Sequence, residues 1–242
     1  AFFWAEVACW VLELLNKPFI LTLHGGNLPA FSNRWPKRVS RLLKSASLVL
    51  TPSHYIKKEL NSFRPDIFYL PNGISINNYH NRFETQFRQK MVWMRAFHSI
   101  YNPIMAIKVL SLLKYNFPDI HLHMIGPDKK DGTLLEVQQA AQYLEVQDNL
   151  RITLGVPKNN VPEVLSKYDI FLNTTNYESF GVAVMEAAAS GMCIVTTDVG
   201  ELPYLWENGH DALLVTPDDS EAMAEAVRRI LTEPGLSEKL SS

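Results

Sequence analysis

Residues 173–191 read NTTNYESFGVAVMEAAASG, and the interpretation of the whole chain starts from this stretch. The segment before it, 169–173, is short, apolar and partly β-branched, which is typical of a strand buried on both faces of a parallel sheet. The small and apolar residues of 182–190 predict a helix that is covered on all sides, and Gly191 stands where a left-handed C-cap belongs. The stretch therefore predicts a strand, a turn and a buried helix.

Glu186 is the one charged residue of this predicted helix. An unpaired carboxylate in such a setting requires a polar partner, from the protein or from a ligand. The carboxyl ends of strands in an open α/β sheet form the usual binding crevice, and a helix amino terminus offers free N–H groups to phosphate. We therefore predict that Phe180, Gly181 and Val182 donate to phosphate. Glu178 and Glu186 should accept hydrogen bonds from the hydroxyl-rich part of the same ligand, a nucleotide-sugar.

Two glutamates eight residues apart mean little alone, but their context is specific. Glu178-Ser-Phe-Gly181 followed by Glu186-Ala-Ala-Ala-Ser-Gly191 resembles the E-x7-E signature of retaining glycosyltransferases of the GT-B fold, in particular family 4. The resemblance implies an α/β fold of two Rossmann-like parallel-sheet domains. It also implies that Glu186 grips the nucleotide ribose, that Glu178 contacts the donor sugar, and that neither a metal nor another cofactor is needed.

A second landmark lies near the start of the chain, where residues 18–23 predict a strand that ends in His24-Gly25-Gly26. From the residues alone, His24 is either a site residue or a hydrogen-bonded structural histidine, and the glycines let backbone approach a ligand closely. The family has a similar HG turn, and this similarity implies that His24 and Gly25 approach the donor sugar from the N-terminal domain.

The residues expected to bind the donor diphosphate depart from the family's pattern. The family usually has Gly-Arg after the first strand of its second domain and a Lys five or six residues later. Here Met94 precedes Arg95, and Ile100 or Tyr101 stands in place of the Lys. The resemblance implies that Arg95 binds phosphate, whereas the alternative is a surface arginine. His98 is the nearest substitute for the missing lysine.

The order of predicted elements divides the chain into domains. The stretch PNGI at 71–74 resembles the family's passage between domains, and strands alternate with helices from residue 91 onward, which predicts a doubly wound sheet. We expect a partial N-terminal domain over 1–73, a linker over 74–88 and a nucleotide-sugar-binding domain over 89–242. Because the family has further strands before the HG turn and a closing helix at its end, we expect a fragment truncated at both ends.

Composition is that of an α/β protein of one or two domains, with 47% hydrophobic and 20% charged residues in 242. The two cysteines lie far apart without metal-ligand spacing, which favours a reducing compartment, and we expect a cytoplasmic location. Glu6 and Glu13 interrupt the apolar start of the chain, so a buried amphipathic helix is expected there rather than a membrane span. We expect no nucleic acid partner and no metal site.

Charge is distributed unevenly, since residues 1–73 hold 9 Lys and Arg against 4 Asp and Glu. A predicted helix over 34–45 carries five basic residues at helical spacing, which are Arg34, Lys37, Arg38, Arg41 and Lys44. Two interpretations stay open for this face. It is a peripheral docking surface for an anionic membrane or acceptor, or it is a solvated basic face.

Three functions are compatible with these patterns. The first is retaining transfer of a sugar from a nucleoside-diphosphate-sugar to a hydroxyl of a glycan, lipid or small-molecule acceptor. The second is a non-catalytic nucleotide-sugar-binding protein, motivated by the missing lysine. The third is a glycoside hydrolase with Glu178 and Glu186 as an acid and base pair, which is disfavoured because one glutamate lies in a turn and the other in the helix that follows it. The donor base and sugar are not predicted.

Overall fold

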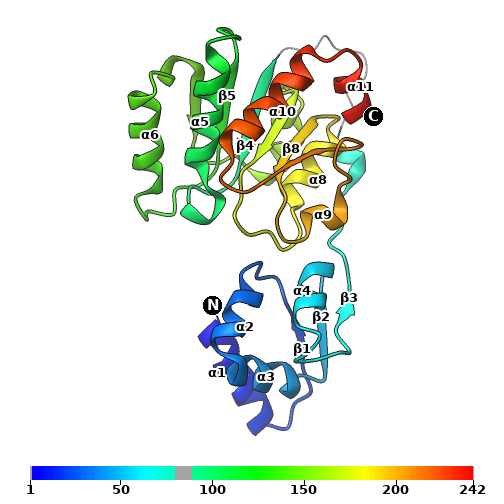
Figure 1. The fold of residues 1–242 in the computed structure, drawn as a ribbon. Coiled ribbons are helices and arrows are strands. Elements are labelled where there is room, and N and C mark those ends of the chain that lie inside the picture. The colour runs from blue at the N-terminus through cyan, green and yellow to red at the C-terminus, as the bar shows by residue number, and fades with distance from the viewer. Residues whose placement is uncertain (1, 80–88, 242) are drawn as a thin grey trace. The chain divides into compact units, whose positions relative to one another are not determined.

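The computed structural model describes residues 2–79 and 89–241, which form two compact units (Figure 1). The first unit comprises Ala1–Gly73 together with Glu178–Phe180, and the second comprises Ile74–Tyr177 with Gly181–Ser242. Of the expected linker 74–88, residues 74–79 group with the second unit and include the short 3-10 helix η1 (Ile76–Asn78). The remainder, 80–88, lies outside the described residues.

The second unit is built on a six-stranded sheet in the order β6-β5-β4-β7-β8-β9, and all of its pairings are parallel. Its strands are β4 (Lys90–Met94), β5 (His121–Ile125), β6 (Leu150–Thr153), β7 (Ile170–Asn173), β8 (Cys193–Thr197) and β9 (Leu213–Val215). The chain runs outward from β4 to β6 and then returns to place β7 on the other side of β4. This reversal makes a topological switch point between β4 and β7, which confirms the predicted doubly wound arrangement.

The sheet separates two apolar cores, because successive side chains of a strand point to opposite faces. Met91 and Trp93 of β4 belong to one core and Val92 belongs to the other. The first core includes helices α5 (Pro103–Lys114), α6 (Thr133–Tyr143), α10 (Ser220–Thr232) and α11 (Leu236–Leu240), and the second includes α7 (Val161–Leu165), α8 (Val182–Ala189) and α9 (Leu202–Leu205). Strands buried on both faces, as predicted for 169–173, are confirmed.

Two details of this unit differ from the sequence-based expectation. Asn102 directly precedes α5 and is a residue type that commonly caps helices, but it has a left-handed φ of 45° and its side chain makes no cap hydrogen bond. Its amide Nδ2 donates instead to Asp218 Oδ1, because the fold brings the loop before α10 next to it. The short helices α9 and α11 were not expected, since neither has the length for a clear 3.6-residue periodicity.

The first unit contains a three-stranded parallel sheet in the order β1-β2-β3. Its strands are β1 (Ile20–Thr22), β2 (Leu48–Thr51) and β3 (Phe68–Tyr69), and its helices are α1 (Phe2–Leu14), α2 (Leu28–Arg34), α3 (Pro36–Ser45) and α4 (His54–Glu59). The helix expected over 34–45 is wrong at its start: Arg34 ends α2, and Trp35 separates it from α3. Pro36 explains the break, because proline disfavours helical geometry in the residue before it.

The expectation that α1 is buried is also wrong. Cys9 is the buried residue of α1, whereas Trp4 is 71% exposed and Leu14 is 62% exposed. Ile20 of β1 is 61% exposed, and β1 is an edge of the small sheet. Among the described strands of this sheet, only β2 has a neighbour on both sides. The apolar residues of α1 and β1 are therefore less buried than their sequence predicts.

Candidate functional site

Arg95 marks the switch point, where β4 and β7 end side by side. Its Nε donates to Asn173 Oδ1 at 3.3 Å, and its guanidinium lies 5.6 Å from the ring centroid of Tyr101. Asn173 is in turn held by a 2.9 Å bond from its Nδ2 to Thr196 Oγ1 of β8. The cation is therefore oriented by an amide on one side and an aromatic face on the other.

Gly126, directly after β5, allows the backbone to pass close to Arg95. A Cβ at this position would stand 1.6 Å from the carbonyl oxygen of Arg95, so no other residue fits without moving the chain. The N–H of Arg95 also donates to the carbonyl of Ile125 at 3.1 Å. A glycine directly after a buried strand is the sequence signal for such a close approach of the backbone.

A cavity of about 370 Å³ opens at this edge of the sheet. Its walls come from the carboxyl ends of β4, β5 and β6 and from the first turns of α8. The lining residues are Met94, Arg95, Ala96, Ile125, Gly126, Pro127, Gly155, Val156, Lys158, Val161, Val182, Ala183 and Glu186. The cavity thus combines a largely apolar wall with two cations and one carboxylate, which suits a ligand that has an apolar ring, anionic groups and hydroxyls.

Helix α8 delivers both a helix amino terminus and a carboxylate to this cavity. Gly181 precedes the helix in a left-handed conformation with φ 90° and ψ 43°, and Val182 begins it. Glu186 lies one turn further along, 8% exposed, on the wall of the cavity. Gly191 has a φ of 70°, so the predicted left-handed residue after the helix is confirmed.

A side chain in the turn before α8 accepts hydrogen bonds from the backbone N–H groups of the same turn. Glu178 is 8% exposed, and its Oε1 accepts the N–H groups of Ser179 at 3.1 Å and Phe180 at 3.4 Å. The Phe180 N–H, predicted to serve a phosphate, is engaged here by the Glu178 carboxylate. The carboxylate closes the turn on itself, in the manner of an acidic side chain near a helix amino terminus.

The predicted site residues are only partly brought together. Arg95, Val182 and Glu186 line one cavity, and Gly181 adjoins it along the chain. His24, Gly25, Glu178 and Phe180 belong to the other compact unit. His24 is exposed after β1, and Gly25 begins the turn into α2, with its carbonyl accepting the N–H of Leu28 at 2.9 Å.

Two residues that sequence analysis missed belong to this site. Lys158 lines the cavity from the loop after β6. Partial burial, together with the nearby Glu186 carboxylate, raises the pKa of the Tyr79 hydroxyl to about 12. Neither residue lies in a stretch with a family landmark, so no sequence signal pointed to them.

The positions considered for the missing lysine serve other contacts. The ring of Tyr101 lies against Arg95, as described above. His98 Nδ1 accepts the N–H of Ile100 at 3.1 Å, and its Nε2 lies 3.7 Å from an Asp131 carboxylate oxygen. In this arrangement His98 caps a 3-10 turn, and it is not among the residues that line the cavity.

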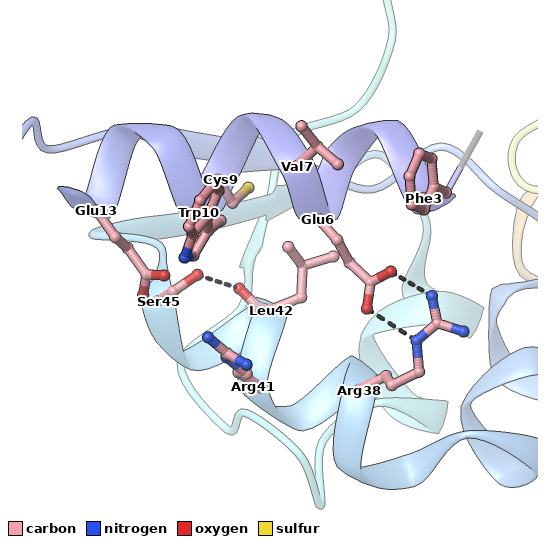
Figure 2. A pocket seen from close by; sticks show the side chains of 10 residues that line it. All are labelled: Phe3, Glu6, Val7, Cys9, Trp10, Glu13, Arg38, Arg41, Leu42 and Ser45. Carbon is pink, nitrogen blue, oxygen red and sulfur yellow. Dashed lines mark hydrogen bonds and ion pairs between the residues drawn. The ribbon is translucent and has the colours of Figure 1, made fainter. Parts of the chain in front are cut away.

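A second cavity, of about 270 Å³, lies in the first unit between α1 and α3 (Figure 2). Figure 2 shows the Glu6 carboxylate of α1 joined to the Arg38 guanidinium of α3. The hydrogen bond from Arg38 holds the pKa of Glu6 below its usual value. Arg34 lies in α2, whereas Arg38 and Arg41 lie in α3 and line this cavity, so the expectation that one helix carries all five cations is wrong. α1 packs against α3 and supplies the carboxylate that pairs with Arg38.

Neither metal ligation nor membrane crossing has a structural basis in the described ranges. Residues 2–79 and 89–241 contain no group of three or more His, Cys, Asp or Glu side chains that could hold a metal. None of the helices in these ranges has both the length and the apolar character that a bilayer span requires. Cys193 is a buried core residue, and its burial raises the pKa of its thiol to about 12.

Similar proteins were found by sequence over nearly the whole chain. TuaC of Bacillus subtilis (strain 168), a glycosyltransferase assigned to teichuronic acid biosynthesis, is 28% identical over 230 residues, which is 92% of this chain and 57% of TuaC. The 2-deoxystreptamine N-acetyl-D-glucosaminyltransferase of Niallia circulans is 23% identical over 94% of this chain and 64% of its own length. The chain therefore spans about three fifths of the length of these relatives.

Solved structures share the fold. HepE of Anabaena, crystallised in complex with UDP and glucose, superposes with a TM-score of 0.85 at 17% identity and covers 100% of this chain and 69% of its own. The C-terminal domain of LpcC, a glycosyl transferase group 1 family protein of Francisella tularensis, gives a TM-score of 0.64 at 17% identity, with coverage of 70% and 93%. At these identities the likeness shows the fold, which is the α/β GT-B fold expected from the sequence.

Two family descriptions match the chain in succession. The description "Glycosyltransferase Family 4" matches residues 1–78, and "Glycosyl transferases group 1" matches residues 82–242. The second match covers most of the chain, including Arg95, Glu178 and Glu186. The chain belongs to the glycosyl transferases group 1 family.

Proposed function

We propose that this protein transfers a sugar from a nucleoside-diphosphate-sugar donor to an acceptor hydroxyl, with retention at the anomeric carbon and without a metal ion. The observation that carries the proposal is the convergence of Arg95, Glu186 and the amino terminus of α8 on one cavity at the switch point of the sheet. The arrangement has a cation and a positive helix end for a diphosphate, and a carboxylate for a sugar diol.

Each group has a separate task in this proposal. Arg95 and the N–H groups of α8 stabilise the charge that develops on the departing diphosphate, so no strong general acid is required. Glu186 accepts hydrogen bonds from the ribose hydroxyls of the donor. Glu178 and His24 contact the donor sugar and stabilise its oxocarbenium-like transition state, and Gly25 lets backbone approach it. The second unit is then the donor domain and the first unit the acceptor side.

Donor binding is tested by thermal shift with UDP, GDP and ADP and with their sugar conjugates. A ligand that binds the native state raises the melting temperature in proportion to ln(1 + [L]/Kd). We expect one nucleotide to stabilise the protein and Glu186→Ala to abolish most of that shift without changing the far-UV circular dichroism. Equal shifts for wild type and Glu186→Ala would remove Glu186 from the donor site.

Catalysis is tested separately, because binding alone also fits a non-catalytic nucleotide-sugar-binding protein. Donor turnover with candidate glycan, lipid and small-molecule acceptors should occur in the presence of EDTA, and proton NMR of the product should give the anomeric configuration of the donor. His24→Ala should lower turnover while nucleotide affinity stays within about twofold of wild type. Nucleotide binding without transfer to any acceptor would favour the non-catalytic alternative.

We further propose a peripheral contact with an anionic membrane through the basic helix residues that remain exposed. Arg34, Lys37, Arg38, Arg41 and Lys44 are all exposed, and α1 adds exposed aromatic residues in the same unit. Sedimentation with vesicles of phosphatidylglycerol should exceed that with phosphatidylcholine. Charge reversal at Lys37 and Lys44 should remove the difference, whereas reversal at Lys57 and Lys58 of α4 should not. Equal sedimentation with both lipids would contradict the proposal.

A further inference from the structure

Asn173 is the last residue of β7 and lies in the interior of the second unit. Its side chain is fully buried, and the strand register places Thr196 of β8 directly opposite it. Its Nδ2 donates to Thr196 Oγ1 at 2.9 Å, and its Oδ1 accepts the Nε–H of Arg95 at 3.3 Å. Both ends of the amide are therefore bound, as a buried polar group requires.

The orientation of this amide follows from the chemistry of its two partners. An arginine side chain has donors and no acceptor, so the amide presents its oxygen to Arg95. The amide nitrogen then points to the hydroxyl oxygen of Thr196, which accepts from it. Asn173 cannot turn over without losing both bonds, so the sheet offers Arg95 one acceptor at a fixed place.

The next residue of the same strand end fixes the aromatic partner of Arg95. Thr174 donates its hydroxyl to the carbonyl oxygen of Tyr101 at 2.8 Å and accepts the Nε1–H of Trp93 at 2.9 Å. The ring of Tyr101 has its centroid 5.6 Å from the guanidinium of Arg95. The amide contact and the ring contact of Arg95 thus both depend on where β7 ends.

We propose that Asn173 is a positioning residue for donor recognition, which holds Nε of Arg95 so that the guanidinium is set in the orientation that receives the donor diphosphate. This inference rests on the proposed function, since it requires Arg95 to bind the diphosphate. Arg95 lines the donor cavity, whereas Asn173 is not among the lining residues. Asn173 therefore acts through Arg95 and does not itself contact the donor.

The chemistry of a guanidinium fits this arrangement. Its five N–H groups lie in one plane, and the four on Nη1 and Nη2 form the fork that binds a phosphate through two parallel hydrogen bonds. A bond at Nε fixes the direction of that fork and occupies one N–H group that the fork does not use. A long side chain that is already ordered also loses less conformational freedom when the ligand binds, which increases affinity.

The test is Asn173→Ala, which removes the amide and leaves Arg95 in place. Calorimetry would compare the tightest-binding of UDP, GDP and ADP with the uncharged nucleoside of the same base. We expect affinity for the diphosphate to fall about 3- to 10-fold, the cost of ordering one long side chain, and affinity for the nucleoside to stay within about twofold. Equal losses for both ligands would indicate a merely structural role and overturn the inference, as would an unchanged affinity for the diphosphate.

Asn149→Ala is the matched control. Asn149 is a buried asparagine of the same unit, its Nδ2 donates to the carbonyl oxygens of Pro118 and Ile120 at 2.9 Å each, and it is not among the residues that line the cavity. The variant makes the same chemical change without touching Arg95. We expect its melting temperature to fall and its diphosphate affinity to match the wild type. A selective loss of diphosphate affinity in Asn149→Ala as well would overturn the role of Asn173.

Thr196→Val provides a second variant, which keeps the shape of the side chain and is used if Asn173→Ala does not fold. It removes the oxygen that holds the Asn173 amide, so the amide is no longer fixed against Arg95. Diphosphate affinity should fall by more than twofold, and nucleoside affinity should not. An equal change for the two ligands would contradict the inference.

A double-mutant cycle separates this inference from the proposed function. In an Arg95→Ala background, Asn173→Ala should change diphosphate affinity less than twofold, because the amide has no guanidinium left to hold. A larger loss in that background would refute action through Arg95. If the wild type binds none of the three nucleotides, the proposed function fails, and the role of Asn173 fails with it. Diphosphate binding that depends on Arg95 but not on Asn173 defeats this inference alone.

Discussion

The guanidinium of Arg95 is held by the Asn173 amide and the Tyr101 ring, and it faces the same cavity as Glu186. Arg95→Ala should weaken binding of a nucleoside diphosphate by about 1.5–3 kcal/mol and leave binding of the uncharged nucleoside nearly unchanged, because the lost bond is charge-assisted. Calorimetry with both ligands measures the difference. Arg151→Ala, at an exposed position on β6, is the control, and equal weakening of both ligands by Arg95→Ala would assign Arg95 a structural role.

His123 gives the second unit a predictable dependence on pH. Burial, together with the nearby charge of Arg151, lowers the pKa of His123 to about 4, and its ring contacts Tyr168 and Thr153. In the unfolded chain the pKa is about 6.5, so the unfolded state binds more protons between these values. The contribution of the neutral His123 side chain to the stability of the folded protein is fully present above pH 6.5 and is lost as the pH falls toward 4.

Lowering the pH from 7 to 5 should therefore reduce the free energy of unfolding by about 2 kcal/mol. Urea unfolding followed by circular dichroism at pH 7 and pH 5 measures it. His123→Gln should remove most of the difference between the two pH values, and His121→Gln, at an exposed position on the same strand, should retain it. A pH dependence that survives in His123→Gln would show that other groups cause it.

At the scale of elements, α8 depends on the backbone conformation of the residue that precedes it. Gly181 has a φ of 90°, a region that costs other residues about 1–2 kcal/mol. Gly181→Ala should therefore lower the unfolding free energy by about 1 kcal/mol or more and also weaken nucleotide binding, because the first turn of α8 lines the cavity. Gly73→Ala, where an added Cβ would meet nothing within 4 Å, is the control. An unaffected melting temperature in Gly181→Ala would contradict the strain argument.

At the scale of the whole molecule, the first unit exposes much apolar surface. Phe3, Trp4, Trp10 and Leu14 of α1 are each more than half exposed, and Ile20 lies on an edge strand. Contiguous apolar surface and open strand edges promote association, so the 242-residue chain should self-associate as its concentration rises.

Size-exclusion chromatography with light scattering measures this association. Replacing Trp4 and Leu14 with lysine should shift the protein toward the monomer. The same change at Tyr115 and Tyr143, which are 92% and 86% exposed in the second unit, should have little effect. A wild type that stays monomeric at high concentration would show that the exposed apolar surface does not drive self-association.

Local sequence was sufficient for most of the second unit. The limits of β5 and β8 can be recognised in the sequence, because each strand is a run of mainly apolar residues followed by a glycine or a polar turn. In the first unit, the Oγ of Ser53 accepts the Ile56 N–H at 3.0 Å, as expected for a serine directly before a helix. These signals act within a few residues of chain, so they can be recognised without a structure.

Burial and partnership depended on the folded chain. Apolar residues in α1 predicted burial, yet what covers a helix is decided by remote segments. Likewise, the sequence predicts Arg38 as part of a basic face, whereas in the structure Arg38 forms a hydrogen bond with Glu6 of α1. The strand pattern, the helix limits and the presence of Glu186 in a buried helix were properties of the sequence. Only the tertiary structure placed Tyr79 near Glu186, joined Arg95 to Asn173 by a hydrogen bond, and added Lys158 to the wall of the same cavity. The physical reason is the sheet order, which brings residues far apart in the chain to one edge.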